Sequence, residues 1–214
     1  LHFLGRPHAA ESVIYNGVDT QTFTPDGEAR SIGNGRVVLS ILSSYKRAFE
    51  LETVITAFEQ LKDAHPDLQL IIAGEIDPRL DWLVNSHPEI HWLGTLPHSQ
   101  LPMLYRAATL FLSAKLRQNC PNAILETMAT GIPTACFDSG AHRELLGDEA
   151  GLCVPLPTDD FGPFPPLDAL ALAQAASTIL SNEATYRRNA RRRAVHQFTL
   201  GKMVDAYVAV FDSL

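Results

Sequence analysis

The sequence predicts an α/β fold in which a parallel sheet carries helices on both faces. Short apolar segments alternate with segments of helical periodicity along most of the chain, which is the pattern of repeated strand–helix–strand units. The apolar segments are continuous, as strands must be when helices cover both faces of their sheet. The connections between them are short, which favours a single domain over residues 1–214.

The first half of the chain supplies five of the expected strands and three of the expected helices. In one segment, Leu51, Val54, Ile55 and Phe58 recur at helical spacing, which indicates an amphipathic helix. Ser99 is placed to cap another helix. The strands are expected at 12–15, 37–42, 68–73, 90–93 and 110–113, and the helices at 51–64, 79–85 and 100–107.

The second half continues the alternation and then becomes helical. Gly131 ends one of its helices. Residues 155–166 are rich in proline and predict a loop, and residues 1–11 are expected to be a lead-in segment. The strands are expected at 134–137 and 151–154, and the helices at 122–130, 141–146, 167–181, 183–197 and 202–213.

Composition narrows the class of function. The net charge of −7 argues against a nucleic-acid partner, because binding to phosphates needs a basic face. No pair among the three cysteines has metal-ligand spacing, so we expect no metal site and a reduced, cytoplasmic setting. No apolar run approaches the roughly 18 residues that a membrane-spanning helix needs.

The loop at 114–122 is the most informative strand end, because ligands of parallel sheets bind where the strands end. It leads into a helix whose first backbone N–H groups, on Asn122, Ala123 and Ile124, predict a diphosphate site. Glu126 follows on the same helix, where its carboxylate can accept hydrogen bonds from ribose hydroxyls. The alternative is that Glu126 only complements the helix dipole.

The segment NCPNAILETMATGIP (119–133) resembles the signature of the retaining family-4 glycosyltransferases. That signature is a Glu, seven residues, a second Glu, and then Ala-Met-Ala-x-Gly-x-Pro. Other segments fit the same family in the right order, so the resemblance covers nearly the whole chain. They are VIYNGVDTQTFTP (13–25), LQLIIAGE (68–75), IHWLGTLPHSQLPMLYRAATLFLSA (90–114) and GAHRELL (140–146).

This resemblance implies one half of a GT-B fold, in which two Rossmann-like domains enclose the active site. The chain matches the C-terminal domain, which binds the nucleotide sugar; the N-terminal acceptor domain is absent from it. The expected parent enzyme transfers a hexose-type sugar from an NDP-sugar, UDP or GDP, to a glycan or lipid-linked acceptor. We expect it to need no metal or cofactor, and the isolated chain to be inactive.

The resemblance also assigns roles to individual residues. It implies that Glu126 holds the ribose and that the backbone at Gly94 and Thr95 faces the base. Gln118 stands at the position of the first Glu, so it contacts the hydroxyls of the donor sugar without supplying a negative charge. Gln118 and Glu126 are thus the candidate catalytic residues.

The family also places an Arg and a Lys near the end of its second strand, where they pair with the diphosphate. Counting along this chain puts Ser44 and Phe49 at those positions. Lys46 and Arg47 lie nearby, and we expect them to neutralise the diphosphate instead. The alternative is that both are solvated loop charges.

Two other functions remain open at this point: half of a GT-B sugar epimerase, and a non-catalytic nucleotide-sugar-binding module. The second is favoured by Gln118 and Phe49. A nicotinamide oxidoreductase is disfavoured, because no G-x-G-x-x-G segment follows a strand.

The remaining candidates have ordinary structural interpretations. We expect His98 to start a helix and His142 to be a surface residue, with a diphosphate contact as the alternative for His142. A peripheral contact with anionic lipid is the alternative to a solvated helix face for the basic cluster, and the apolar stripe is expected to be core. The cluster is Arg187, Arg188, Arg191, Arg192 and Arg193, and the stripe is Val204, Tyr207, Val208 and Phe211.

Overall fold

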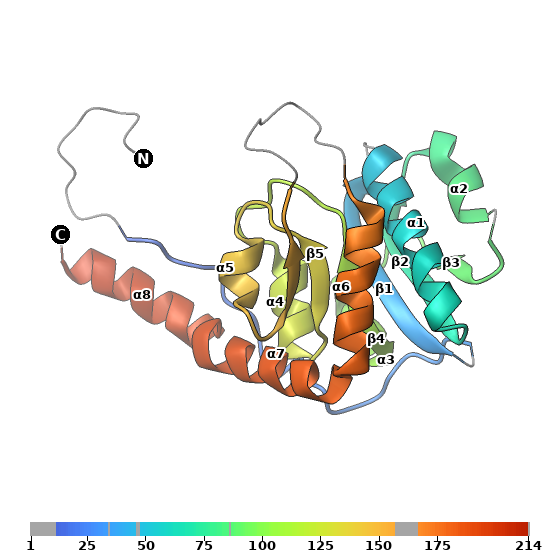
Figure 1. The fold of residues 1–214 in the computed structure, drawn as a ribbon. Helices are drawn as coiled ribbons and strands as arrows, with labels where there is room; N and C mark the ends of the chain where they lie inside the picture. Colours follow the sequence, from blue (N-terminus) through green and yellow to red (C-terminus); the bar gives the residue numbers. More distant parts are fainter. Residues whose placement is uncertain (1–11, 34, 46–47, 86, 157–166, 214) are drawn as a thin grey trace.

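The predicted fold class is confirmed by the computed structural model, which describes residues 12–33, 35–45, 48–85, 87–156 and 167–213. Six strands of these ranges form one sheet in the order β3-β2-β1-β4-β5-β6, and every neighbouring pair is parallel (Figure 1). The order reverses direction between β1 and β4, as in doubly wound α/β folds. The strands are β1 (Arg36–Tyr45), β2 (Leu68–Ile76), β3 (Ile90–Trp92), β4 (Ala108–Ser113), β5 (Thr134–Phe137) and β6 (Gly151–Val154).

Helices cover both faces of the sheet (Figure 1). Side chains of α1 and α6 pack on one face, and those of α3, α4, α5 and α7 pack on the other. The α-helices are α1 (Ala48–Ala64), α2 (Asp81–Asn85), α3 (Leu101–Ala107), α4 (Asn122–Ala129), α5 (His142–Leu146), α6 (Ala169–Ser181), α7 (Glu183–Gln197) and α8 (Leu200–Asp212). Two 3₁₀ turns, η2 (Pro78–Leu80) and η3 (His98–Gln100), precede α2 and α3.

Neighbouring residues of each strand point to opposite faces, so each strand contributes to two cores. Val38 of β1 belongs to the core under α1 and α6, whereas Val37 and Leu39 belong to the core under α4 and α7. All three are buried. Both sides of the strand are therefore apolar, and this is why the strands appear in the sequence as continuous apolar segments.

Three local predictions are wrong. Residues 12–15 form no strand; the nearest pairing is an isolated bridge between Val18 and Thr199. Ser99 lies inside η3, and the side chain at the N-cap of α3, Gln100, makes no capping hydrogen bond. The helix expected at 79–85 is divided into η2 and α2, because Asp77 caps a separate 3₁₀ turn that begins with Pro78. Of the loop expected at 155–166, residues 157–166 lie outside the described residues.

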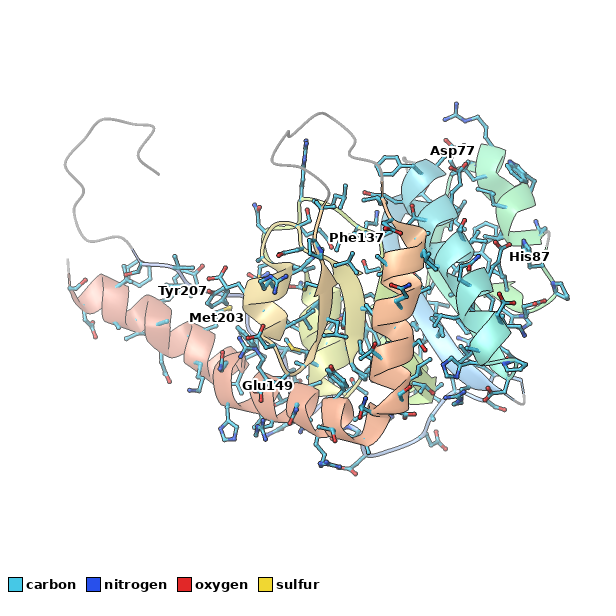
Figure 2. The ribbon with its side chains drawn as sticks, in the orientation of Figure 1. Asp77, His87, Phe137, Glu149, Met203 and Tyr207 are labelled. Carbon is cyan, nitrogen blue, oxygen red and sulfur yellow. The ribbon has the colours of Figure 1, made fainter. Side chains whose placement is uncertain are left out.

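The apolar stripe of α8 is exposed, which contradicts its expected place in the core. Val204, Tyr207 and Val208 are about half exposed and Phe211 is 68% exposed. Figure 1 shows α8 extending beyond the sheet, and Figure 2 shows Tyr207 on this extension. The stripe makes α8 amphipathic, but the described residues supply no surface that buries it. None of the helices in the described ranges has the length and apolarity that crossing a bilayer requires.

The basic cluster of α7 is a set of structural braces more than a solvated face. Arg191 donates to the backbone carbonyls of Thr20, Phe23 and Ala129, at 3.1, 2.9 and 2.5 Å. The other arginines also have partners: Arg187 donates to Ala108 O, Arg188 to Thr185 Oγ1, Arg192 to Glu149 and Arg193 to the carbonyls of Glu144 and Leu145. Figure 2 labels Glu149 beside α7. The bonds of Arg191 and Arg193 hold α7 against the N-terminal segment and the ends of α4 and α5, whereas the bond of Arg188 lies within α7.

Candidate functional site

A cavity of about 290 Å³ lies at the carboxyl ends of β1 and β4, where the strand order reverses. This is the place where open α/β sheets bind their ligands. Its volume is close to the lower limit of about 300 Å³ for small-molecule pockets. The lining residues are Asn16, Ile41, Phe111, Ser113, Lys115, Gln118, Cys120, Pro121, Asn122, Ala123 and Ile124.

The N-terminus of α4 opens into this cavity. Its N-cap residue is Pro121, which offers no side-chain hydrogen bond to the first N–H groups of the helix. The N–H of Ile124 donates to Pro121 O at 3.1 Å. Of the three N–H groups predicted to bind a diphosphate, those of Asn122 and Ala123 therefore remain available. The helix dipole favours an anion beside them.

The loop that carries Gln118 is held by the turn after β5. The N–H of Arg117 donates to Ser139 Oγ at 2.8 Å, and the N–H of Ala141 donates to Gln118 O at 3.0 Å. Gly140 has φ +63°, and a Cβ there would lie 2.2 Å from Gln118 O. Only glycine permits this close approach. Arg117 also has a positive φ of 59°, which is unusual for a residue with a side chain.

Asn16 is a site residue that the sequence reasoning missed. Its Nδ2 donates to Cys120 O at 3.2 Å and to Asn122 Oδ1 at 2.9 Å. The side chain thus ties the N-terminal segment to the start of α4. In the sequence, Asn16 stands before Gly17, a pair that is typical of a turn, and its long-range contact leaves no local signal.

Gln118 lies beside His142, which is completely buried and not at the surface as expected. His142 Nδ1 lies 2.8 Å from Phe137 O, so this nitrogen carries the proton, and Nε2 lies 3.3 Å from Gln118 Oε1. Burial lowers the pKa of His142 and favours the neutral ring. An amide can turn its NH₂ end to the lone pair of a neutral Nε2, whereas a carboxylate would favour the charged imidazolium.

Glu126 is buried and joined to two other side chains. Its Oε2 accepts the hydroxyl of Tyr105 at 2.7 Å, and its Oε1 lies 3.0 Å from His98 Nε2. Burial raises the pKa of Tyr105 well above its usual value, and the adjacent carboxylate raises it further, so the hydroxyl remains a donor. Phe23 packs edge-on against both rings.

The position of Glu126 on α4 weighs against the alternative that its carboxylate only complements the helix dipole. Asn122 is the first residue of α4, and no acidic residue lies in the first turn. The influence of the dipole falls off within that turn. His98 does begin a 3₁₀ turn, as expected, but it also points to Glu126 with 69% of its own side chain exposed.

The loop of Gly94 and Thr95 lies beyond β3, in the segment that ends at His98. The N–H of Gly74 donates to Gly94 O at 2.7 Å, and Trp92 Nε1 donates to Gly74 O at 2.9 Å, so the ends of β2 and β3 are pinned together. Gly94 has φ +63°, and the space where its Cβ would be is open. A flat ligand group can therefore approach this backbone.

The structure describes only some of the residues that bear on the expected cation site. Lys46 and Arg47 lie outside the described residues. Phe49, at the position where the resemblance puts a lysine, packs against the core under α1 and α6. Lys115 is a described cation that lines the cavity, and its Nζ lies 3.5 Å from Glu50 Oε2. Within the ranges that the structure describes, no group of three His, Cys, Asp or Glu residues is arranged to hold a metal ion.

A larger hollow of about 510 Å³ lies elsewhere, between α7 and the residues Pro25 and Gly131. Gly131 precedes β5, so this hollow is at the opposite end of the strands. Its walls are largely the side chains of arginines that brace the fold, and none of the predicted site residues lines it.

Comparisons with known proteins identify the family of the chain. The sequence model of the family described as Glycosyl transferases group 1 matches residues 36–182. The chain is 23% identical over 223 residues to the lipopolysaccharide core biosynthesis mannosyltransferase LpsB of Rhizobium meliloti (strain 1021), an alignment that covers 95% of this chain and 61% of LpsB.

Two solved structures show the same fold. Alr3699/HepE of Anabaena, crystallised in complex with UDP, has a TM-score of 0.73 at 19% identity, over 95% of this chain and 57% of HepE. The C-terminal domain of the group 1 family protein LpcC from Francisella tularensis has a TM-score of 0.68 at 18% identity, over 86% of this chain and 100% of that domain. The chain thus spans less than two thirds of LpsB and just over half of HepE.

Proposed function

This chain belongs to the group 1 glycosyl transferases, and on that premise we propose that it is the nucleotide-sugar-binding domain of a retaining glycosyltransferase. The observation that carries the proposal is the cavity at the switch point of the sheet, into which the uncapped N-terminus of α4 opens. A helix N-terminus of this kind is suited to a diphosphate. The complex of HepE with UDP supports a nucleotide ligand for this fold.

The proposed donor lies across the carboxyl edge of the sheet. The N–H groups of Asn122 and Ala123 bind the diphosphate, and the sugar enters the cavity towards Gln118. Glu126 accepts the ribose hydroxyls, and the backbone of Gly94 and Thr95 faces the base. These roles need no metal ion, because the helix dipole and a basic side chain offset the charge of the leaving diphosphate.

The complete enzyme transfers the sugar to a glycan or lipid-linked acceptor held by a second domain, and it works in the cytoplasm, with or without peripheral contact with the membrane. LpsB, a lipopolysaccharide core mannosyltransferase, supports a glycan acceptor. A non-catalytic binding module is the second candidate, and the neutral Gln118 beside a buried histidine favours it. Sugar turnover by the complete protein separates the two.

The first prediction is that one class of nucleotide diphosphate stabilises the 214-residue chain. A ligand that binds only the native state at a hundred times its Kd adds about 2.7 kcal/mol of stability. We expect UDP or GDP, with its sugars, to raise the unfolding temperature by several degrees, and the chain alone to transfer no sugar. A thermal-shift survey of UDP-, GDP- and ADP-sugars measures this. No shift with any of them at millimolar concentration would contradict the proposal.

A further inference from the structure

Lys115 and Glu50 form a nearly buried ion pair beside the cavity. Lys115 Nζ lies 3.5 Å from Glu50 Oε2, and their side chains are 12% and 4% exposed. Glu50 belongs to the first turn of α1, and its Oε1 also accepts the N–H of Leu116 at 3.4 Å. One carboxylate thus fixes both the backbone after β4 and the ammonium group of Lys115.

The position of the pair relative to the cavity is asymmetric. Lys115 lines the cavity together with Gln118, Asn122 and Ala123, whereas Glu50 is not part of the lining. Among the lining residues that the structure describes, Lys115 is the only one with a formal positive charge. The ammonium group therefore belongs to a residue that lines the cavity, whereas its carboxylate partner belongs to one that does not.

A buried lysine is costly unless a partner keeps it charged. Burial favours the neutral amine, and an adjacent carboxylate opposes that effect. Glu50 is such a partner for Lys115. Replacing a buried ion pair by apolar residues of similar size is often neutral or stabilising, so fold stability alone is a weak explanation for the pair.

We infer that Lys115 is the cation that binds the donor diphosphate, an inference that rests on the proposed function. The diphosphate lies between the ammonium group and the N–H groups of Asn122 and Ala123. Lysine is an established phosphate ligand that acts as a point charge. Phe49 packs into the core beside Glu50, so α1 supplies the carboxylate and the loop after β4 supplies the cation.

The test separates binding from fold stability by removing both charges together. In the double variant Lys115→Met/Glu50→Gln no buried charge is left alone, so its unfolding temperature should stay near that of the parent. Its affinity for UDP or GDP should fall about tenfold, because one charged hydrogen bond is lost. Affinity for uridine or guanosine, which carry no phosphate, should not change. Calorimetric titration measures all four ligands.

Two single variants decide how the pair acts. Glu50→Gln removes the carboxylate that competes with the ligand, and the bound diphosphate can replace it as the partner of the ammonium group, so this variant should bind the diphosphate more tightly than the double variant. Lys62→Met is the matched control: it removes a lysine paired with Glu89 at the far end of α1 and should leave binding unchanged.

The inference is overturned if the double variant binds the diphosphate like the parent. It is also overturned if Glu50→Gln weakens binding as much as the double variant. The loss would then come from breaking the ion pair and not from removing the positive charge of Lys115. A parent chain that binds neither UDP nor GDP would overturn the proposed function as well. If the parent binds UDP or GDP and the double variant binds it with the same affinity, only the role of Lys115 is overturned.

Discussion

Replacing Glu126 by alanine is expected to weaken binding of the nucleoside diphosphate by about tenfold to a hundredfold. A hydrogen bond to a charged group contributes roughly 1.5–3 kcal/mol, and every 1.4 kcal/mol is about a factor of ten in affinity. The buried carboxylate is already oriented by Tyr105 and His98, so little ordering is needed when ribose hydroxyls bind. Isothermal titration of parent and variant with UDP and GDP measures the difference.

The variant needs a control, because Glu126→Ala also leaves the buried hydroxyl of Tyr105 without its acceptor. That loss is expected to lower stability by about 1–3 kcal/mol. Glu126→Gln retains an acceptor for Tyr105 but removes the charge, and it should still bind more weakly than the parent. Glu59→Ala, which removes an exposed carboxylate of α1 paired with His87, should change neither affinity nor fold.

Gln118→Ala should behave in the opposite way. Gln118 is expected to touch only the donor sugar, so affinity for the nucleoside diphosphate should barely change while affinity for the full nucleotide sugar falls. If Glu126→Ala binds both ligands like the parent, the ribose assignment is wrong and Glu126 serves only the fold.

Replacing Arg191 by alanine is expected to lower the free energy of unfolding by about 3 kcal/mol. Its guanidinium donates to three backbone carbonyls, on Thr20, Phe23 and Ala129. Ala129 is the last residue of α4, where carbonyl groups lack partners within the helix and a positive charge is favourable. Each hydrogen bond from a charged donor is worth roughly 1.5–3 kcal/mol at most, and losses in one network are not additive.

Arg188→Ala is the matched control on the same helix. Arg188 is exposed and donates only to the hydroxyl of Thr185, at 3.3 Å, among the contacts that the structure gives it. We expect this variant to stay within about 0.5 kcal/mol of the parent. Urea denaturation of both variants measures the contrast. Equal losses would mean that the charge of α7, and not the bracing of α4, governs stability.

The strands and their covering helices could be predicted because their patterns are local. Leu70, Ile71 and Ile72 form an unbroken apolar run, and the parallel sheet buries both faces of that run. The stripe of α8 shows the limit of the same reasoning. Periodicity identified Tyr207 and Phe211 as one face of a helix, but it carries no information on what, if anything, covers that face.

The site was predictable only where a motif lies within one segment. Asn122, Ala123 and Glu126 follow one another on α4, so a short signature identifies them together. The contact between Lys115 and Glu50 joins residues that are 65 positions apart, and no local sequence pattern indicates such a contact. His142 illustrates the same limit, because its burial under the Gln118 loop depends on tertiary packing.

The central claim is that the donor diphosphate binds at the N-terminus of α4. A backbone amide NMR titration of the 214-residue chain with UDP and GDP tests it most directly. We predict that the amide signals of Asn122 and Ala123 shift and saturate with the affinity measured by calorimetry. Shifts confined to the hollow beside α7, at Arg188, Val195 and His196, with Asn122 and Ala123 unmoved, would contradict it.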